Sequence, residues 1–288
     1  MLASFVVLIV VAGAAIQVLT NSGIVVVVVA FVIAMAMAWG SYFYSDRVAL
    51  AVSHARPADG PEYRRYHNLV EGLCIAAGLP KPRLHVVDDP APNAFATGRD
   101  PKHAALAVTT GLLERMNRVE LEGVIAHELS HVKNYDILAS TVAVTAVGTV
   151  VLISDIDLRL LWFGGGRRDR RDRSDGNPLG LILVVVAFAF LVLAPLAAQV
   201  MQFAMSRKRE LLADASGVAL TRYPPGLASA LRKLRDDTAV VHHASRATAQ
   251  MWIESPLDRV EHKRGTRLNR LFDTHPPLEE RIRVLEEM

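Results

Sequence analysis

The sequence predicts a mostly helical α+β domain with a small β-sheet, joined to four membrane-spanning helices arranged as two hairpins. Two observations predict this class. The 288 residues are 51% hydrophobic and have a mean hydropathy of +0.26, which is too apolar for an ordinary soluble chain, and the excess lies in long uncharged runs. Between these runs, short strand-like segments precede stretches with the apolar spacing of helices.

The uncharged runs come in two pairs. Three of them are long enough to cross a hydrocarbon layer, which needs about 20 helical residues. The remaining one is shorter and contains four hydroxyl side chains, so it is the weakest candidate. We therefore expect an N-terminal hairpin over residues 1–44 and a second hairpin over 137–205, with a charged loop at 154–178. The four segments are Leu2–Thr20, Gly23–Tyr44, Ile137–Ile153 and Leu179–Val200.

Basic residues near these segments predict the orientation. Arginine and lysine follow the second and fourth segments, at Arg47 and at Arg207–Arg209, which places the remaining parts on the cytoplasmic side. The loop at 154–178 contradicts this rule, because it holds six arginines. Either the first hairpin overrides those charges, or the third and fourth segments dip into the bilayer without crossing. Interleaved aspartates argue against a nucleic-acid role for the loop.

The polar part of the chain is expected to form one domain from two pieces, residues 45–136 and 206–288. A mostly helical lead-in covers Ser45–Glu71. The C-terminal piece reads as helices with breaks at Pro224–Pro225 and Pro276–Pro277. Short β-branched or apolar runs bounded by turn residues predict three strands, at Pro82–Val87, Phe95–Thr97 and Ala104–Thr109.

The helix after Asn117 carries the most informative stretch, His127-Glu128-Leu129-Ser130-His131. Two histidines four apart project from one face of a helix and can bind one Zn²⁺, while Glu128 can act on a metal-activated water as a general base. The alternative is two exposed histidines on a solvated face. An apolar stripe along the same helix, together with a capping pair at Asn117 and Glu120, favours the metal site.

A catalytic zinc needs a third protein ligand, and Glu210 is the best candidate. Glu210 and Asp214 are also four apart on a predicted helix, so both carboxylates share one face. Asp214 can then accept the second N–H of a ligating histidine. Taken alone, the two acids would read as solvated charges, but beside the histidine pair the metal-site interpretation is better.

Four motifs in this order resemble the HtpX family of membrane zinc endopeptidases, which are relatives of the CAAX prenyl endopeptidases. The resemblance covers nearly the whole chain and rests on these segments: Asn93–Gly98, His127–His131, Arg209–Asp214 and Thr274–Ile282. It implies a zincin-type, gluzincin-like peptidase domain that holds one Zn²⁺ at His127, His131 and Glu210, with Glu128 as the general base. It also implies membrane-protein quality control as the biological setting.

Further candidates would bind substrate. By the resemblance, His275 lies near the metal and could stabilise the oxyanion or hold substrate, and Asn93 could bind substrate backbone. The strand at 104–108 is either purely structural or an exposed sheet edge to which an extended peptide adds. By similarity to zinc peptidases of this helix type, we expect the substrate edge at Ala104, Ala105 and Ala107.

These features predict a membrane-bound zinc endopeptidase that acts on membrane or misfolded proteins at the cytoplasmic face of the cell membrane. The alternatives are a CAAX-type prenyl-protein peptidase and a catalytically inactive membrane scaffold. The single cysteine, Cys74, cannot form an internal disulfide and fits a reducing compartment. The net charge of +3 fits contact with lipid headgroups rather than nucleic acid. The sequence does not specify an oligomeric state.

Overall fold

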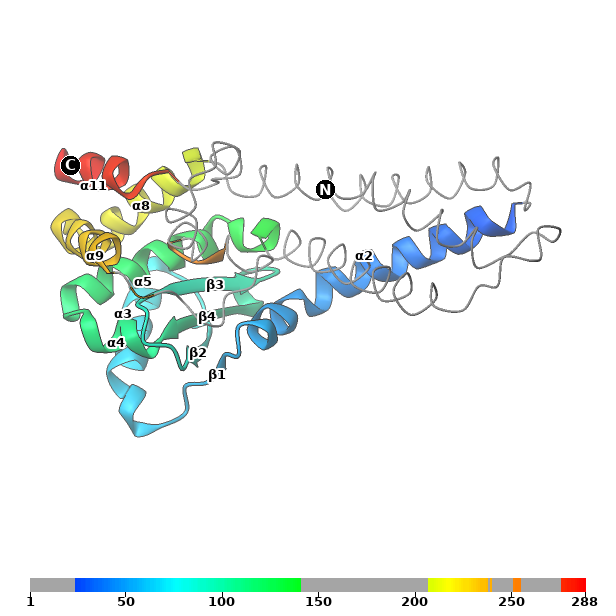
Figure 1. Cartoon of the computed structure of the whole chain (residues 1–288), viewed down its shortest axis with the longest axis horizontal. Helices are drawn as coiled ribbons and strands as arrows, with labels where there is room; N and C mark the ends of the chain where they lie inside the picture. Colours follow the sequence, from blue (N-terminus) through cyan, green and yellow to red (C-terminus); the bar gives the residue numbers. More distant parts are fainter. Residues whose placement is uncertain (1–23, 141–206, 238, 240–250, 255–275) are drawn as a thin grey trace, which may run out of the picture. The chain divides into compact units, whose positions relative to one another are not determined.

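The computed structural model describes residues 24–140, 207–237, 239, 251–254 and 276–288 (Figure 1). The chain divides into two compact units, residues 1–42 with 145–200 and residues 43–144 with 201–288. The second unit contains every described element except the first part of α2. Its sheet and its helices position the candidate site.

A four-stranded sheet has the order β1-β2-β4-β3. Strands β2 and β4 are parallel, whereas β1 pairs antiparallel with β2 and β3 pairs antiparallel with β4. The three predicted strands are confirmed, and β1 was not predicted because it is only two residues long. The strands are β1 (Arg56–Pro57), β2 (Arg83–Val87), β3 (Ala94–Gly98) and β4 (Ala104–Thr109).

The strand order corrects the predicted substrate edge. Ala104, Ala105 and Ala107 belong to β4, which is paired with β2 on one side and with β3 on the other. A strand with both ladders formed has no free backbone groups for a peptide to pair with. The prediction for these residues is therefore wrong, and β3 is the outer strand on that side of the sheet.

The described helices agree with the predicted helical segments. The lead-in at 45–71 proves to be the end of α2, the short strand β1, a 3₁₀ turn and the start of α3. The predicted breaks lie at helix starts: Pro224 begins α9, and Pro277 is the N-cap residue of α11. The bounds are α2 (Val25–Val52), η1 (Pro61–Tyr63), α3 (Arg64–Ala77), η2 (Pro101–His103), α4 (Thr110–Arg115), α5 (Arg118–Lys133), α8 (Arg207–Thr221), α9 (Pro224–Asp236) and α11 (Leu278–Glu286).

The N-terminus of α5 has the capping box that the sequence predicts. The Asn117 side chain accepts from the Glu120 backbone N–H at 3.0 Å, and the Glu120 carboxylate accepts from the Asn117 N–H at 2.8 Å. Glu120 also accepts from Lys233 and Ser229 of α9. These bonds satisfy free backbone donors at the helix start and fix α9 against it.

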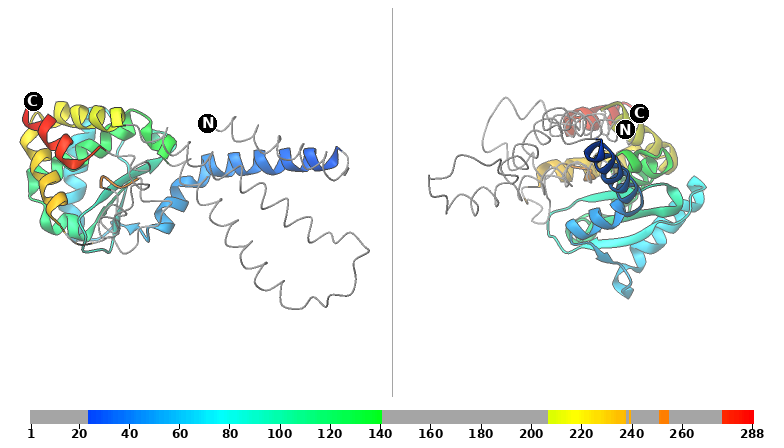
Figure 2. Two further views of the ribbon diagram at one scale, coloured as in Figure 1. Left: turned by 45° about the horizontal axis from the view of Figure 1, so that its top comes forward. Right: turned by 90° about the vertical axis from the view of Figure 1, so that its right-hand side faces the viewer.

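Both faces of the sheet are covered, and alternate residues of each strand face opposite sides. Leu106 and Val108 of β4 pack into the main core with α3, α5 and α9, whereas Ala105 and Ala107 pack into a smaller cluster. The smaller cluster also contains the end of α2 and Trp252. The sheet therefore lies between two apolar layers, and α5 lies on the side of the main core (Figure 2).

Helix α8 packs directly on α5 at a point where a glycine allows close approach. A Cβ atom on Gly217 would lie 3.0 Å from the backbone nitrogen of His127 and 3.2 Å from its Cα. These distances are shorter than ordinary van der Waals contact, so a side chain at this position would push the two helices apart. The small residue brings the start of α8 within reach of the histidines.

The membrane segments are mostly outside the described residues. Within the part of the chain that the structure describes, no helix has both the length and the apolar character needed to cross a membrane. Segments Leu2–Thr20 and Leu179–Val200 and most of Ile137–Ile153 lie outside that part. Segment Gly23–Tyr44 coincides largely with α2, which is confirmed as a helix. The arrangement of four spans stays a prediction.

Candidate metal centre

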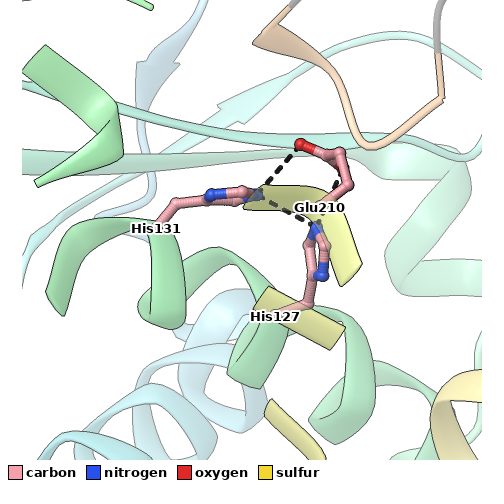
Figure 3. Close-up of side chains that lie close together, drawn as sticks. All are labelled: His127, His131 and Glu210. Atoms are coloured by element: carbon pink, nitrogen blue, oxygen red, sulfur yellow. Dashed lines mark hydrogen bonds and ion pairs between the residues drawn. The ribbon is translucent and has the colours of Figure 1, made fainter. Parts of the chain in front are cut away.

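Three predicted ligands meet between helices α5 and α8 (Figure 3). His127 and His131 project from α5, and Glu210 projects toward them from the first turn of α8. The Nε2 atoms of the two histidines are 3.2 Å apart, and the Glu210 carboxylate oxygens lie 3.7 Å from Nε2 of His127 and 3.5 Å from Nε2 of His131. All of the candidate ligand atoms lie within 4.8 Å of one another.

The other nitrogen of each imidazole faces an aspartate. Nδ1 of His127 lies 2.8 Å from Asp214 Oδ1, and Nδ1 of His131 lies 3.1 Å from Asp136 Oδ2. A neutral imidazole in such a contact carries its proton on Nδ1 and leaves a lone pair on Nε2. In this neutral form two lone pairs and a carboxylate converge on one point, where a proton or a metal cation relieves their mutual repulsion.

This donor set fits a tetrahedral zinc site. With metal–ligand bonds of about 2.0–2.1 Å, neighbouring ligand atoms in a tetrahedron are separated by about 3.3 Å. The separation of the two Nε2 atoms, 3.2 Å, lies close to this value, and the two oxygens of Glu210 lie 3.5 Å from one Nε2 and 3.7 Å from the other. Two imidazole nitrogens and one carboxylate oxygen also form a common ligand set of catalytic zinc.

Asp136 is a site residue that the sequence analysis missed. Helix α5 ends at Lys133, and Tyr135 then adopts a left-handed conformation with φ of 60°. This turn folds the chain back, so that Asp136 reaches His131 on the preceding turn of the helix. Tyrosine rarely adopts positive φ, so the sequence carried no signal for this reversal. Arg209 of α8 lies 3.6 Å from the other Asp136 oxygen.

Burial shapes the electrostatics of the site. The side chain of His127 is buried, which lowers its pKa despite the neighbouring Asp214. Burial also acts to lower the pKa of His131, but the carboxylates of Glu210 and Asp136 outweigh it and raise this pKa to about 9. The negative surroundings of His131 therefore attract positive charge, which a bound dication supplies.

Glu128 lies beside the ligands in the position expected of a general base. Its side chain is only 2% exposed, and burial raises its pKa to about 7 although the Ala96 backbone N–H donates to its carboxylate. A pKa near neutrality suits a group that both accepts and returns a proton. Glu128 and the three ligands line one hollow, together with Ala96, Asp136, Ile137, Ser140, Arg209, Met251, Trp252 and Ile253.

Asn93 makes contacts within the chain, and its predicted substrate role stays a prediction. Its side-chain Nδ2 donates to the Glu254 backbone oxygen at 2.8 Å, and its Oδ1 accepts from the backbone N–H groups of Ala94 and Glu254. The amide therefore holds the segment Met251–Glu254 against the start of β3. The Ile253 N–H also donates to the Ala94 carbonyl at 2.9 Å. His275 lies outside the described residues, and its role stays a prediction.

Comparison with known proteins agrees with this arrangement. The model of peptidase family M48 matches residues 61–288. A "Protease HtpX homolog" from Caldanaerobacter subterraneus subsp. tengcongensis is 47% identical over 250 residues, which cover 87% of this chain and 80% of the relative. Another from Lactobacillus acidophilus is 47% identical over 293 residues, covering 99% of this chain and 94% of the relative.

The fold also has a likeness among solved structures. The crystal structure of Ste24p from S. mikatae superposes with a TM-score of 0.54 at 17% sequence identity. The match covers 96% of this chain, and this chain spans 62% of the length of that protein. At this identity the likeness concerns the fold alone.

The contact between His131 and Asp136 leads to a testable prediction. Replacement of Asp136 by alanine removes the acceptor that holds the His131 proton on Nδ1, and loss of such a partner weakens metal binding by about 10–100-fold. Competition with a chromophoric chelator would measure the zinc Kd of the purified variant. Asp88, an exposed aspartate after β2, provides the control as Asp88→Ala. Equal affinities for the parent and both variants would remove Asp136 from the site.

Proposed function

Since this chain belongs to peptidase family M48 and is a metalloprotease, we propose that it is a membrane-attached zinc endopeptidase that hydrolyses peptide bonds at the cytoplasmic face. One observation carries the zinc assignment: two imidazole Nε2 atoms face each other at 3.2 Å with the Glu210 carboxylate beside them. Nitrogen and oxygen ligands in this number favour zinc by geometry and availability.

The proposed chemistry needs one metal ion and one base. A bound zinc supplies a water of lowered pKa and a positive charge that polarises the peptide carbonyl. Glu128 accepts a proton at its carboxylate from the attacking water and delivers it to the nitrogen of the leaving amine. The Ala96 N–H holds that carboxylate beside the ligands. Asp214 and Asp136 keep the protons of His127 and His131 on Nδ1.

The role of Glu128 is tested by Glu128→Gln. Glutamine has nearly the same shape but cannot accept the proton, so we expect kcat to fall by about 10²–10⁴-fold while the zinc content stays at one equivalent. Cleavage of an unfolded protein such as casein by the purified, detergent-solubilised chain provides the rate, and elemental analysis provides the metal. The control is Glu122→Gln on the same helix. Parent-like cleavage by the Glu128 variant would refute the base assignment.

We further propose that substrate binds along β3 rather than along β4. The Ala96 N–H points away from β4 toward Glu128, and alternate residues of a strand direct their backbone groups to the same side. The backbone of Ala94, Ala96 and Gly98 therefore faces outward. The chain's own Ile253 pairs with Ala94 and Trp252 forms a bridge with Phe95, and Ala96 lies next along the strand, beside Glu128. An extended peptide added there would present its carbonyl to the metal ligands.

Peptides methylated on single backbone nitrogens test this binding mode. Strand pairing uses the N–H groups of alternate residues only, so we expect kcat/KM to fall by about tenfold at every second position near the cleaved bond. The same peptides without methylation set the reference rate. An effect that is uniform along the peptide, or confined to the cleaved bond, would argue against addition to β3.

Membrane attachment is the part of the proposal that rests on the sequence. The uncharged segments at 2–20, 23–44 and 179–200 support it, as do the basic residues that follow the second and fourth segments. Tethering next to the bilayer would favour substrates that are membrane proteins, their cytosolic loops or misfolded chains. Quality control of such proteins is therefore the biological role that we propose.

Single cysteines test the orientation in a variant without Cys74, the chain's one cysteine. We expect a cysteine at Ser174, in the charged loop, to react with an impermeant thiol reagent in intact cells. A cysteine at Asp88, exposed on the catalytic unit, should react only after lysis. Reaction of Asp88→Cys in intact cells would place the catalytic unit outside. Reaction of Ser174→Cys only after lysis would show that the second hairpin does not cross.

A further inference from the structure

A buried arginine stands behind the metal ligands and has no role in the proposed chemistry. Arg281 belongs to α11, the last helix, and its side chain is completely buried. Its Nε donates to Asp214 Oδ2 at 2.8 Å and its Nη2 donates to Asp214 Oδ1 at 2.7 Å. Two parallel bonds of this kind fix the plane of the carboxylate as well as its position.

The fixed carboxylate in turn holds a metal ligand. Asp214 Oδ1 also lies 2.8 Å from Nδ1 of His127, so one oxygen receives both the arginine and the imidazole. The guanidinium lies alongside the imidazole as well, with Nη2 at 3.4 Å from Nδ1 and 3.5 Å from Nε2. Its Nη1 donates to the Ile253 carbonyl at 3.2 Å. The arginine thus connects the C-terminal helix to the proton-bearing side of His127.

The guanidinium of Arg281 balances part of the negative charge that is buried at the site. Glu128, Asp136, Glu210 and Asp214 are all buried, and Arg281 is the buried cation among them in the described part of the chain. With a dication bound, these four carboxylates in their charged forms, the guanidinium groups of Arg281 and Arg209, and the metal sum to zero. Without the guanidinium of Arg281 the filled site would keep a net negative charge in a poorly solvated place, which is costly.

Packing alone does not explain this residue. Arg281 lies on the inner face of α11 beside Ile282 and Leu285, whereas Arg283 on the same helix is exposed. Apolar residues of similar volume often stabilise a core better than a buried ion pair does, because they need no desolvation of charge. The role of the guanidinium therefore lies in its two hydrogen bonds to Asp214, which fix the carboxylate that contacts His127.

We propose that Arg281 is a positioning residue for the metal ligand His127, which it orients through Asp214 while it balances the charge of the filled site. This inference rests on the proposed zinc site. It predicts that α11, the C-terminal helix of nine residues, contributes to zinc affinity although none of its residues is a proposed ligand.

Zinc affinity of the purified, detergent-solubilised chain tests the inference without reference to turnover. We expect Arg281→Met to raise the zinc Kd by about 10–100-fold, in line with the loss of other groups that orient ligands. Arg281→Lys keeps the charge but not the paired bonds, so its zinc Kd should lie between those of the parent and of Arg281→Met. The control is Arg283→Met on the exposed face of α11, which should bind as the parent does. Visible spectra of the cobalt-substituted proteins report the ligand geometry independently.

A double variant distinguishes positioning from general support of the fold. Because Arg281 acts through Asp214, adding Arg281→Met to Asp214→Asn should weaken zinc binding much less than it does in the parent background. Parent-like Kd values and cobalt spectra in Arg281→Lys and in any folded Arg281→Met protein would overturn this inference alone. An equal rise in the zinc Kd on adding Arg281→Met to the parent and to Asp214→Asn would also overturn it. A parent chain that binds no zinc would overturn the proposed function first.

Discussion

The meeting of two imidazole lone pairs with a carboxylate is the constraint on which the rest of the site depends. His127 and His131 each place their proton toward an aspartate, so their Nε2 atoms approach as acceptors at 3.2 Å. Two neutral acceptors at this distance repel each other, and either a proton or a metal cation between them makes the contact favourable. The aspartates orient both rings toward one point, and a metal that binds there replaces the proton that the raised pKa of His131 otherwise retains.

The fold keeps these groups together through one close helix contact. Glu210 and Asp214 reach His127 because α8 approaches α5 at Gly217, where a Cβ atom would lie 3.0 Å from the His127 nitrogen. The two helices are separated in sequence by the segment 137–205 that is predicted to form a hairpin. Arg209 and Asp136 stand at the two ends of that segment and lie 3.6 Å apart. The ligand set is therefore completed only when both ends of the segment are brought together.

Sequence patterns predicted the local parts of this site better than its long-range parts. The spacing of His127 and His131 and the capping pair before them follow from helix periodicity alone, and both appear in the structure. The order of strands in the sheet does not follow from the strands themselves, so the prediction of an edge at β4 is wrong. Asp136 depended on the positive φ of Tyr135, and Arg281 reads as an ordinary exposed charge on an amphipathic helix. The place of β4 in the sheet and the positions of Asp136 and Arg281 depend on strand pairing and tertiary contacts, which local sequence patterns do not specify.

X-ray absorption at the zinc edge, on zinc-loaded parent protein in detergent, tests the central claim most directly. The account predicts one zinc per chain with two imidazole nitrogens and oxygen ligands at about 2.0–2.1 Å and with no sulfur. It also predicts that Glu210→Ala changes the oxygen shell and leaves both imidazoles in place. A spectrum with one imidazole or none, with sulfur from Cys74, or without any change in the Glu210 variant would contradict it.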